Sequence, residues 1–121
     1  SRVHFTGTLA HADYVKVLQV SRLHVYLTYP FILSWSMLEA MAAGCLVLGS
    51  ATPPVEEVIT EGENGLLFPF HSPRVLAMRA IDALAHPGDH DALRQAARQT
   101  IMDRYDFETV SLPAYKRMIE I

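Results

Sequence analysis

Two serines and a glutamate lie close together near residue 36, and their types and spacing could bind a phosphorylated sugar. Ser34 and Ser36 stand at the start of a strongly helix-forming run, residues 36–43, and Glu39 follows one turn later. The start of a helix presents unpaired N–H groups and about half a positive charge, which together favour a diphosphate. A carboxylate one turn inside has two acceptor oxygens, enough for both hydroxyls of a ribose diol. The segment therefore predicts a diphosphate at the serines and a ribose on Glu39.

The same residues also have a purely structural interpretation. Residues 36–39, Ser-Met-Leu-Glu, match the capping box S-x-x-E. In that motif the glutamate side chain only accepts a hydrogen bond from the backbone N–H of the N-cap residue, here Ser36. Periodicity alone favours this interpretation over ligand binding. One carboxylate oxygen could also cap the helix while the other binds a ligand, so the residue types leave both roles open.

Alternating strand and helix signals surround this segment. Short runs of apolar and β-branched residues predict strands, and longer runs with apolar residues three and four apart predict helices. Gly44, Pro53-Pro54 and His86-Pro87-Gly88 mark boundaries between them. The expected strands are 3–5, 23–27, 45–49 and 65–68, and the expected helices are 12–21, 36–43, 55–59, 72–85, 91–105 and 107–121, the last disturbed in its middle by Pro113.

This order predicts an α/β fold, a Rossmann-like three-layer sandwich with a parallel sheet of about four strands followed by C-terminal helices. The run 45–49 is apolar throughout, as expected for a parallel strand buried on both faces. Ligands of open parallel sheets bind outside the carboxyl ends of the strands, where residues 28–35 lie. A complete doubly wound domain usually has more strands, so we expect further strands upstream of Ser1.

Composition restricts the class of protein. The chain has 121 residues, of which 50% are hydrophobic and 19% charged. These values are expected for a single globular domain rather than a disordered chain. The net charge is −3 and no run is rich in Lys or Arg, so nucleic acid is not an expected partner. Cys45 is the only cysteine and cannot form an internal disulfide, which favours the cytoplasm. The six histidines show no zinc-binding spacing, and we expect no metal site.

Residues 31–68, FILSWSMLEAMAAGCLVLGSATPPVEEVITEGENGLLF, carry a family resemblance. They resemble the donor-site core of retaining glycosyltransferases with the GT-B fold, of the glycosyltransferase group 1, family 4 type. That family's pattern is E-x7-E-A-M-A-x-G-x-P-V, then G-G-x-x-E, then G-x-x-G-x-L. The more specific parts here are EAMAAG at 39–44 and EVITEGENGLL at 57–67, and the resemblance extends over residues 3–105.

The resemblance implies a function and a division of the site. Glu39 matches the second glutamate of the pair, which binds the ribose of the nucleotide. Backbone amides nearby match those that hold the diphosphate and the donor sugar. The binding residues expected on this basis are Glu39, Ile32, Leu33, Ser34, Trp35 and Ser36.

The resemblance also implies what the chain needs in order to act. The partner is a nucleotide sugar, which is the donor substrate, and transfer to an acceptor proceeds with retention and without a cofactor or metal. Residues 1–121 are expected to be the C-terminal part of the donor-binding domain, without the N-terminal acceptor domain or the upstream strands. This fragment alone should be inactive, and its bare surfaces could make it self-associate. We expect a cytoplasmic protein, with peripheral contact to the inner membrane as the alternative.

Departures from the family pattern leave other functions open. Phe31 stands where the first glutamate belongs, and its ring cannot replace a carboxylate in catalysis. Pro53-Pro54 replaces the Gly-Gly of the next loop and cannot donate the same N–H groups. Glu57 matches a family glutamate and could brace the donor loop. The alternatives are a non-catalytic Rossmann-like nucleotide-binding module that has lost its first active-site glutamate, and a purely structural domain with no cleft beside Glu39.

Overall fold

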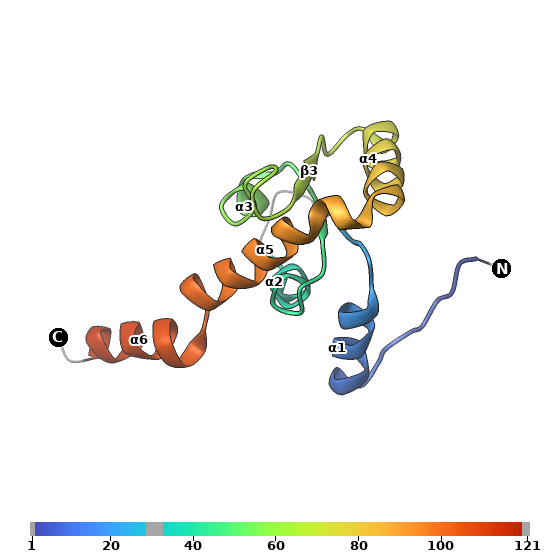
Figure 1. Cartoon of the computed structure of the whole chain (residues 1–121). Coiled ribbons are helices and arrows are strands. Elements are labelled where there is room, and N and C mark those ends of the chain that lie inside the picture. The colour runs from blue at the N-terminus through green and yellow to red at the C-terminus, as the bar shows by residue number, and fades with distance from the viewer. Residues whose placement is uncertain (1, 29–32, 120–121) are drawn as a thin grey trace.

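The structure is a computed structural model that describes residues 2–28 and 33–119, without the side chain of Phe107 (Figure 1). Helices and strands alternate along most of the chain. The connection Pro87–His90 is a 3-10 turn, and a π-helical turn, Phe107–Ser111, precedes the last helix. The elements are α1 (His11–Val20), β1 (His24–Tyr26), α2 (Trp35–Ala42), β2 (Val47–Ser50), α3 (Pro53–Glu56), β3 (Leu66–Phe68), α4 (Pro73–Ala85), α5 (Asp91–Arg104) and α6 (Leu112–Ile119).

The three strands form one parallel sheet in the order β1-β2-β3. In its register Val25 lies opposite Leu48, and Leu48 lies opposite Leu66. All four residues of β2 are buried, as the apolar run predicts for a central strand covered on both faces. The predicted fold class is therefore confirmed, with three strands in the described part of the chain rather than about four.

The predicted strand at residues 3–5 is wrong. Val3 is 65% exposed and Phe5 is 97% exposed, and the segment runs away from the sheet as an extended chain (Figure 1). β-Propensity reflects packing on a sheet more than an intrinsic backbone preference. Within the described ranges the sheet consists of β1, β2 and β3, and residues 3–5 do not join it.

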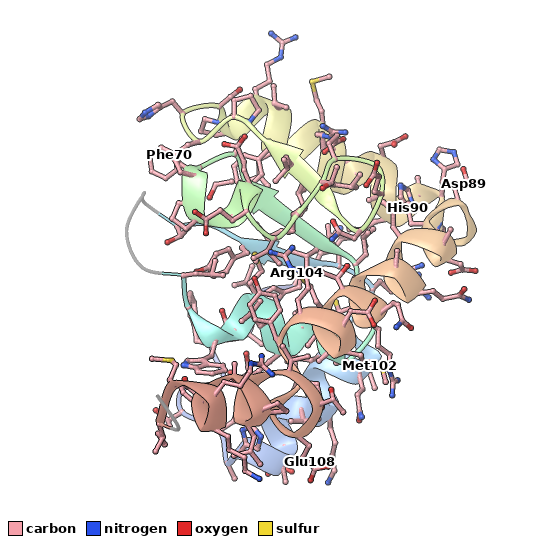
Figure 2. All side chains as sticks on the ribbon, turned by 90° about the vertical axis from the view of Figure 1, so that its left-hand side faces the viewer. Phe70, Asp89, His90, Met102, Arg104 and Glu108 are labelled. Carbon is pink, nitrogen blue, oxygen red and sulfur yellow. The ribbon has the colours of Figure 1, made fainter. Side chains whose placement is uncertain are left out.

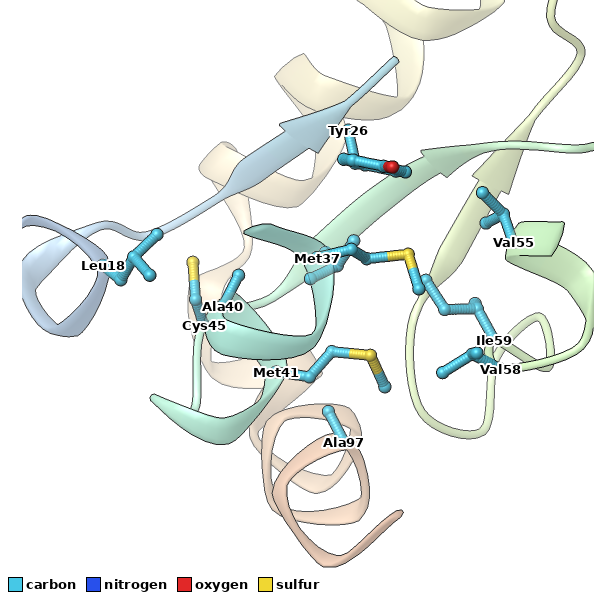
Figure 3. Close-up of a cluster of buried hydrophobic side chains, with 11 residues drawn as sticks. Leu18, Tyr26, Met37, Ala40, Met41, Cys45, Val55, Val58, Ile59 and Ala97 are labelled. Atoms are coloured by element: carbon cyan, nitrogen blue, oxygen red, sulfur yellow. The ribbon is translucent and has the colours of Figure 1, made fainter. Parts of the chain in front are cut away.

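Helices cover both faces of the sheet with two separate apolar clusters. On one face the cluster includes Met37 and Met41 of α2, which Figure 3 shows directed into the space near α3 and α5. Ala97 of α5 is buried in the same cluster, where its small side chain lets α5 approach α2 closely. On the other face Leu48 and Phe68 pack with Ala83 of α4. This arrangement is the α/β/α sandwich that the strand pattern predicts.

The end of α2 is fixed by a Schellman motif. The N–H of Gly44 donates to the carbonyl oxygen of Met41, and the N–H of Cys45 donates to that of Ala40, both at 3.0 Å. Gly44 has a φ of +78°, a left-handed conformation in which a Cβ would be strained. The glycine therefore ends the helix and turns the chain into β2.

The C-terminal helix expected over residues 107–121 is helical without a break from Phe107 to Ile119, and it is disturbed near Pro113 as expected. The segment is π-helical over Phe107–Ser111 and α-helical from Leu112, so the change of pitch falls directly before the proline. A proline inside a helix removes a backbone hydrogen bond and clashes with the preceding turn, which accounts for an irregular turn at this place. No helix within the described ranges is long and apolar enough to cross a bilayer.

Candidate functional site

The carboxyl ends of β1 and β2 position the start of α2. Tyr26, buried at the end of β1, accepts a hydrogen bond on its hydroxyl from the backbone N–H of Ser34 at 2.9 Å. Thr28 donates its N–H to Oγ of Ser50 at 3.2 Å, and that hydroxyl donates to the carbonyl oxygen of Thr28 at 3.1 Å. These bonds join the two strand ends at the edge of the sheet where ligands of this fold class bind.

Ser34, rather than Ser36, caps α2. Its backbone is extended, with φ −78° and ψ 149°, and its Oγ accepts a hydrogen bond from the N–H of Ser36 at 3.2 Å. The predicted capping box, which has Ser36 as its N-cap residue, is therefore wrong, because the helix begins at Trp35. Glu39 consequently lies in the second turn, beyond the position from which a side chain can reach back to the cap.

The other predicted residues at this helix start have different surroundings. Leu33 packs against the core cluster on the α2 face of the sheet. Trp35 is 76% exposed, and the Ser36 hydroxyl accepts a hydrogen bond from Ser34 at 3.2 Å. Ile32, like Phe31, lies outside the described residues. The helix start is thus open to solvent at Trp35, and its binding of a diphosphate stays a prediction.

Glu39 faces a pocket of about 270 Å³ between α1, α2 and α5, which we call the α1–α2–α5 pocket. α1 contributes one face of the helix, because three of its lining residues are four positions apart. α2 and its cap contribute Glu39 with two small alanines beside it, and α5 contributes one arginine. The lining residues are His11, Val15, Gln19, Glu39, Ala42, Ala43 and Arg98.

The carboxylate of Glu39 has an unfilled hydrogen-bonding capacity. Its Oε2 is buried and has no hydrogen-bond partner among the described residues. A buried polar atom without a partner costs about 1–3 kcal/mol, and more if it is charged, so native proteins rarely keep one without a reason. Burial raises the pKa of the neighbouring Tyr14, and the charge of Glu39 raises it further. Glu39 thus lines the pocket with a carboxylate of which one oxygen lacks a hydrogen-bond partner among the described residues.

Arg98 supplies a positive charge on the α5 wall of the same pocket. It is exposed, and no ion pair joins it to Glu39 in the described part of the chain. Neither Arg98 nor the α1 wall was predicted from the sequence. The spacing of His11, Val15 and Gln19 could have indicated a common helix face. Nothing local could have placed Arg98 there, because the contact depends on how α5 packs on α2.

The acidic residues after α3 are solvent-exposed, and one of them has a structural role. Glu61 accepts a hydrogen bond from the N–H of Leu67 at 2.6 Å and pairs with Arg79 of α4. Arg79 also donates to the carbonyl oxygen of Leu67 at 2.8 Å, so the pair fastens β3 to α4. Glu57 is exposed, and its backbone carbonyl oxygen accepts a hydrogen bond at 3.2 Å from Arg104. Figure 2 labels the side chain of Arg104 on α5. Bracing of the donor loop by the Glu57 side chain stays a prediction.

Cys45 belongs to the core. Its thiol is buried and lies 3.4 Å from the carbonyl oxygen of Ser21, and burial raises its pKa. A buried thiol with a raised pKa is a poor nucleophile. In the described residues no group of three or more His, Cys, Asp or Glu side chains is arranged to hold a metal ion.

Comparisons with known proteins agree with this architecture. Residues 1–100 match the family model described as glycosyl transferases group 1. A phosphatidyl-myo-inositol mannosyltransferase of Mycobacterium tuberculosis is 35% identical over 78 residues, which cover 62% of this chain and 21% of that protein. The sucrose-phosphate synthase of Thermosynechococcus elongatus superposes with a TM-score of 0.87 at 26% identity, covering 98% of this chain and 30% of that one. The Anabaena protein HepE, in complex with UDP and glucose, superposes with a TM-score of 0.88 at 20% identity, covering 99% and 32%.

The fold is that of a Rossmann-like α/β domain of the GT-B type. The chain belongs to the glycosyl transferases group 1 family. It spans between about a fifth and a third of the length of the three proteins above.

Proposed function

We propose that this chain binds the nucleotide part of a nucleotide-activated sugar, so that the protein containing it can transfer the sugar to an acceptor. The observation that carries the proposal is the buried, unpartnered Oε2 of Glu39 at an open pocket in the described part of the chain. A ribose offers two adjacent hydroxyl donors, which a carboxylate can accept together. The family resemblance supports the same role for Glu39.

The start of α2 would hold the diphosphate of the same ligand. Trp35 begins the helix four residues before Glu39, which is slightly more than one helical turn. Ribose and diphosphate are neighbouring groups in a nucleotide, so this separation suits one ligand. The N–H of Trp35 and the helix dipole would face the phosphate oxygens, whereas the N–H groups of Ser34 and Ser36 already donate to hydroxyl groups within the chain.

UDP is the first ligand to test. HepE has been seen with UDP and glucose, and it shares the fold with this chain. The pocket is slightly smaller than typical small-molecule sites, so it would hold part of a nucleotide sugar rather than all of it. The remainder would lie over the start of α2.

The chain would act as the C-terminal part of a donor-binding domain, with further strands and an acceptor-binding domain supplied by the rest of the protein. The outer edge of β1 supports this proposal, because Val25 and Leu27 are 44% and 60% exposed beside it. Exposed apolar strand edges are normally covered. Retention at the anomeric carbon and independence from metal are further parts of the proposal, supported by the family resemblance alone. The isolated fragment would not turn over substrate.

Calorimetric titration of UDP into the natural protein that carries this chain tests the nucleotide site. Glu39→Gln should lower the affinity at least several-fold, because hydrogen bonds to a charged group contribute about 1.5–3 kcal/mol. Glu63→Gln, an exposed glutamate outside the pocket, is the matched control and should leave the affinity unchanged. Unchanged binding in Glu39→Gln would remove Glu39 from the site.

A second candidate is a nucleotide-binding module without transferase activity, favoured by Phe31 in place of the family's first glutamate. The two candidates differ in turnover. A protein that binds UDP-sugars but neither transfers nor hydrolyses them over a panel of sugars and acceptors would support the second. Restored or increased turnover in Phe31→Glu would show that the missing carboxylate limits activity.

A further inference from the structure

We propose that the base of the bound nucleotide lies against α1, over His11 and Val15. This inference rests on the proposed function, since it takes the ribose to be on Glu39. It adds a specificity-determining wall to the site, formed by a helix that the family motif in residues 31–68 does not include.

The arrangement of the pocket gives the direction of the base. The base is attached to C1′ of the ribose, and the diphosphate is attached through C5′ to C4′, at the other side of the ring oxygen. With the diphosphate at the start of α2 and the diol on Glu39, the base is directed away from that helix start. The pocket there is bounded by the face of α1 that carries His11, Val15 and Gln19. Ala42 and Ala43 present only methyl groups and cannot distinguish one base from another.

His11 and Val15 have the chemistry that a base requires. Val15 is partly buried and offers an apolar surface for the face of a ring. The imidazole of His11 is an aromatic ring with two nitrogens that can donate or accept, so it can stack on a base or bond its edge. Its ring centroid lies 6.3 Å from that of Tyr14, at an interplanar angle of 44°. Tyr14 packs against the core cluster, so it holds the histidine ring beside a fixed neighbour.

The test separates the base from the rest of the nucleotide. UDP and ribose 5-diphosphate, which lacks the base, are titrated into the natural protein and its His11→Ala variant. Replacing an aromatic side chain that stacks on a base with alanine typically lowers the affinity for the nucleotide by about fivefold or more. His11→Ala should therefore weaken UDP by at least about fivefold and leave ribose 5-diphosphate unchanged. His4→Ala, an exposed histidine outside the pocket, is the matched control and should change neither affinity.

The outcomes distinguish this inference from the proposed function. If His11→Ala leaves UDP binding unchanged, or weakens both ligands equally, the base does not lie on α1 and the inference is overturned. Glu39→Gln should weaken both ligands, because both contain the ribose diol. If Glu39→Gln weakens neither, the ribose site itself is wrong and the proposed function fails with it. Circular dichroism of each variant shows whether it is folded, independently of either ligand.

Discussion

The hydroxyl of Tyr26 accepts a hydrogen bond from the backbone N–H of Ser34 at 2.9 Å, joining the end of β1 to the cap of α2. Tyr26 is 7% exposed whereas Ser34 is exposed, so this bond is partly buried. The bond sets where α2 begins relative to the sheet. The position of Glu39 on that helix therefore depends on a side chain that does not line the pocket.

Tyr26→Phe should destabilise the protein by about 0.5–1.5 kcal/mol, because one partly buried hydrogen bond between the sheet and the cap of α2 is lost. Urea unfolding followed by circular dichroism measures the change. Tyr115→Phe removes a hydroxyl from an exposed tyrosine. Its stability should stay within about 0.5 kcal/mol of the wild type. Equal stabilities of the two variants would mean that the Tyr26 bond does not hold the helix start.

Gly49→Ala should be strongly destabilising. A Cβ at this position of β2 would lie 2.9 Å from Cγ1 of Val55, closer than real Cβ contacts, and Val55 is itself fully buried in the core. Overpacking of a core typically costs about 1–3 kcal/mol. Gly88→Ala is the control, since a Cβ there meets nothing within 4 Å. Thermal unfolding should show a lower melting temperature for Gly49→Ala alone.

The stability of the protein should fall as pH decreases below about 6.5 because of His24. Burial lowers the pKa of His24 from its ordinary value of 6.5, and its Nε2 is buried without a partner in the described residues. Between the folded-state pKa and 6.5, the unfolded chain binds a proton that the folded chain does not. The free energy of unfolding therefore decreases as the pH falls through this window, and the contribution of His24 to stability is fully present above it.

Replacing His24 by Gln tests this pH dependence. Unfolding free energies measured in urea between about pH 5 and 8 should slope less steeply with pH in His24→Gln than in the wild type. His71→Gln, at an exposed histidine, should keep the wild-type slope. The same slope in His24→Gln and the wild type would contradict a role for His24.

Local sequence signals located most elements, because their causes are local. The apolar run at 45–49 and the left-handed Gly44 place the end of α2 and the start of β2 to within two residues. The strand predicted at residues 3–5 is wrong because a strand forms only beside a neighbouring strand, and β-propensity carries no information about neighbours. The N-cap of α2 is Ser34 rather than the predicted Ser36. Either serine could have capped the helix, and the hydrogen bond from the N–H of Ser34 to Tyr26, a residue of the sheet, favours Ser34.

The candidate site was predictable only in part. Glu39 stands out through its place in EAMAAG, and the structure puts it at a pocket. Arg98 and the α1 face come from helices that precede and follow the motif, and only the packing of α1 and α5 on α2 brings them together. Residue types and spacing describe one helix at a time, so they cannot predict which residues of a second helix will line a pocket beside the first.

Because α2 has a fixed beginning at Ser34 and a fixed end at Gly44, its eight residues can neither slide nor unwind by a turn without breaking several bonds. The backbone that carries Glu39 is thus fixed before any ligand arrives. At the proposed site, binding would then require little loss of conformational entropy from this backbone, and preorganisation of this kind strengthens association without adding a contact. Loosening either end of the helix should weaken a ligand on Glu39 even though every atom that touches it is unchanged.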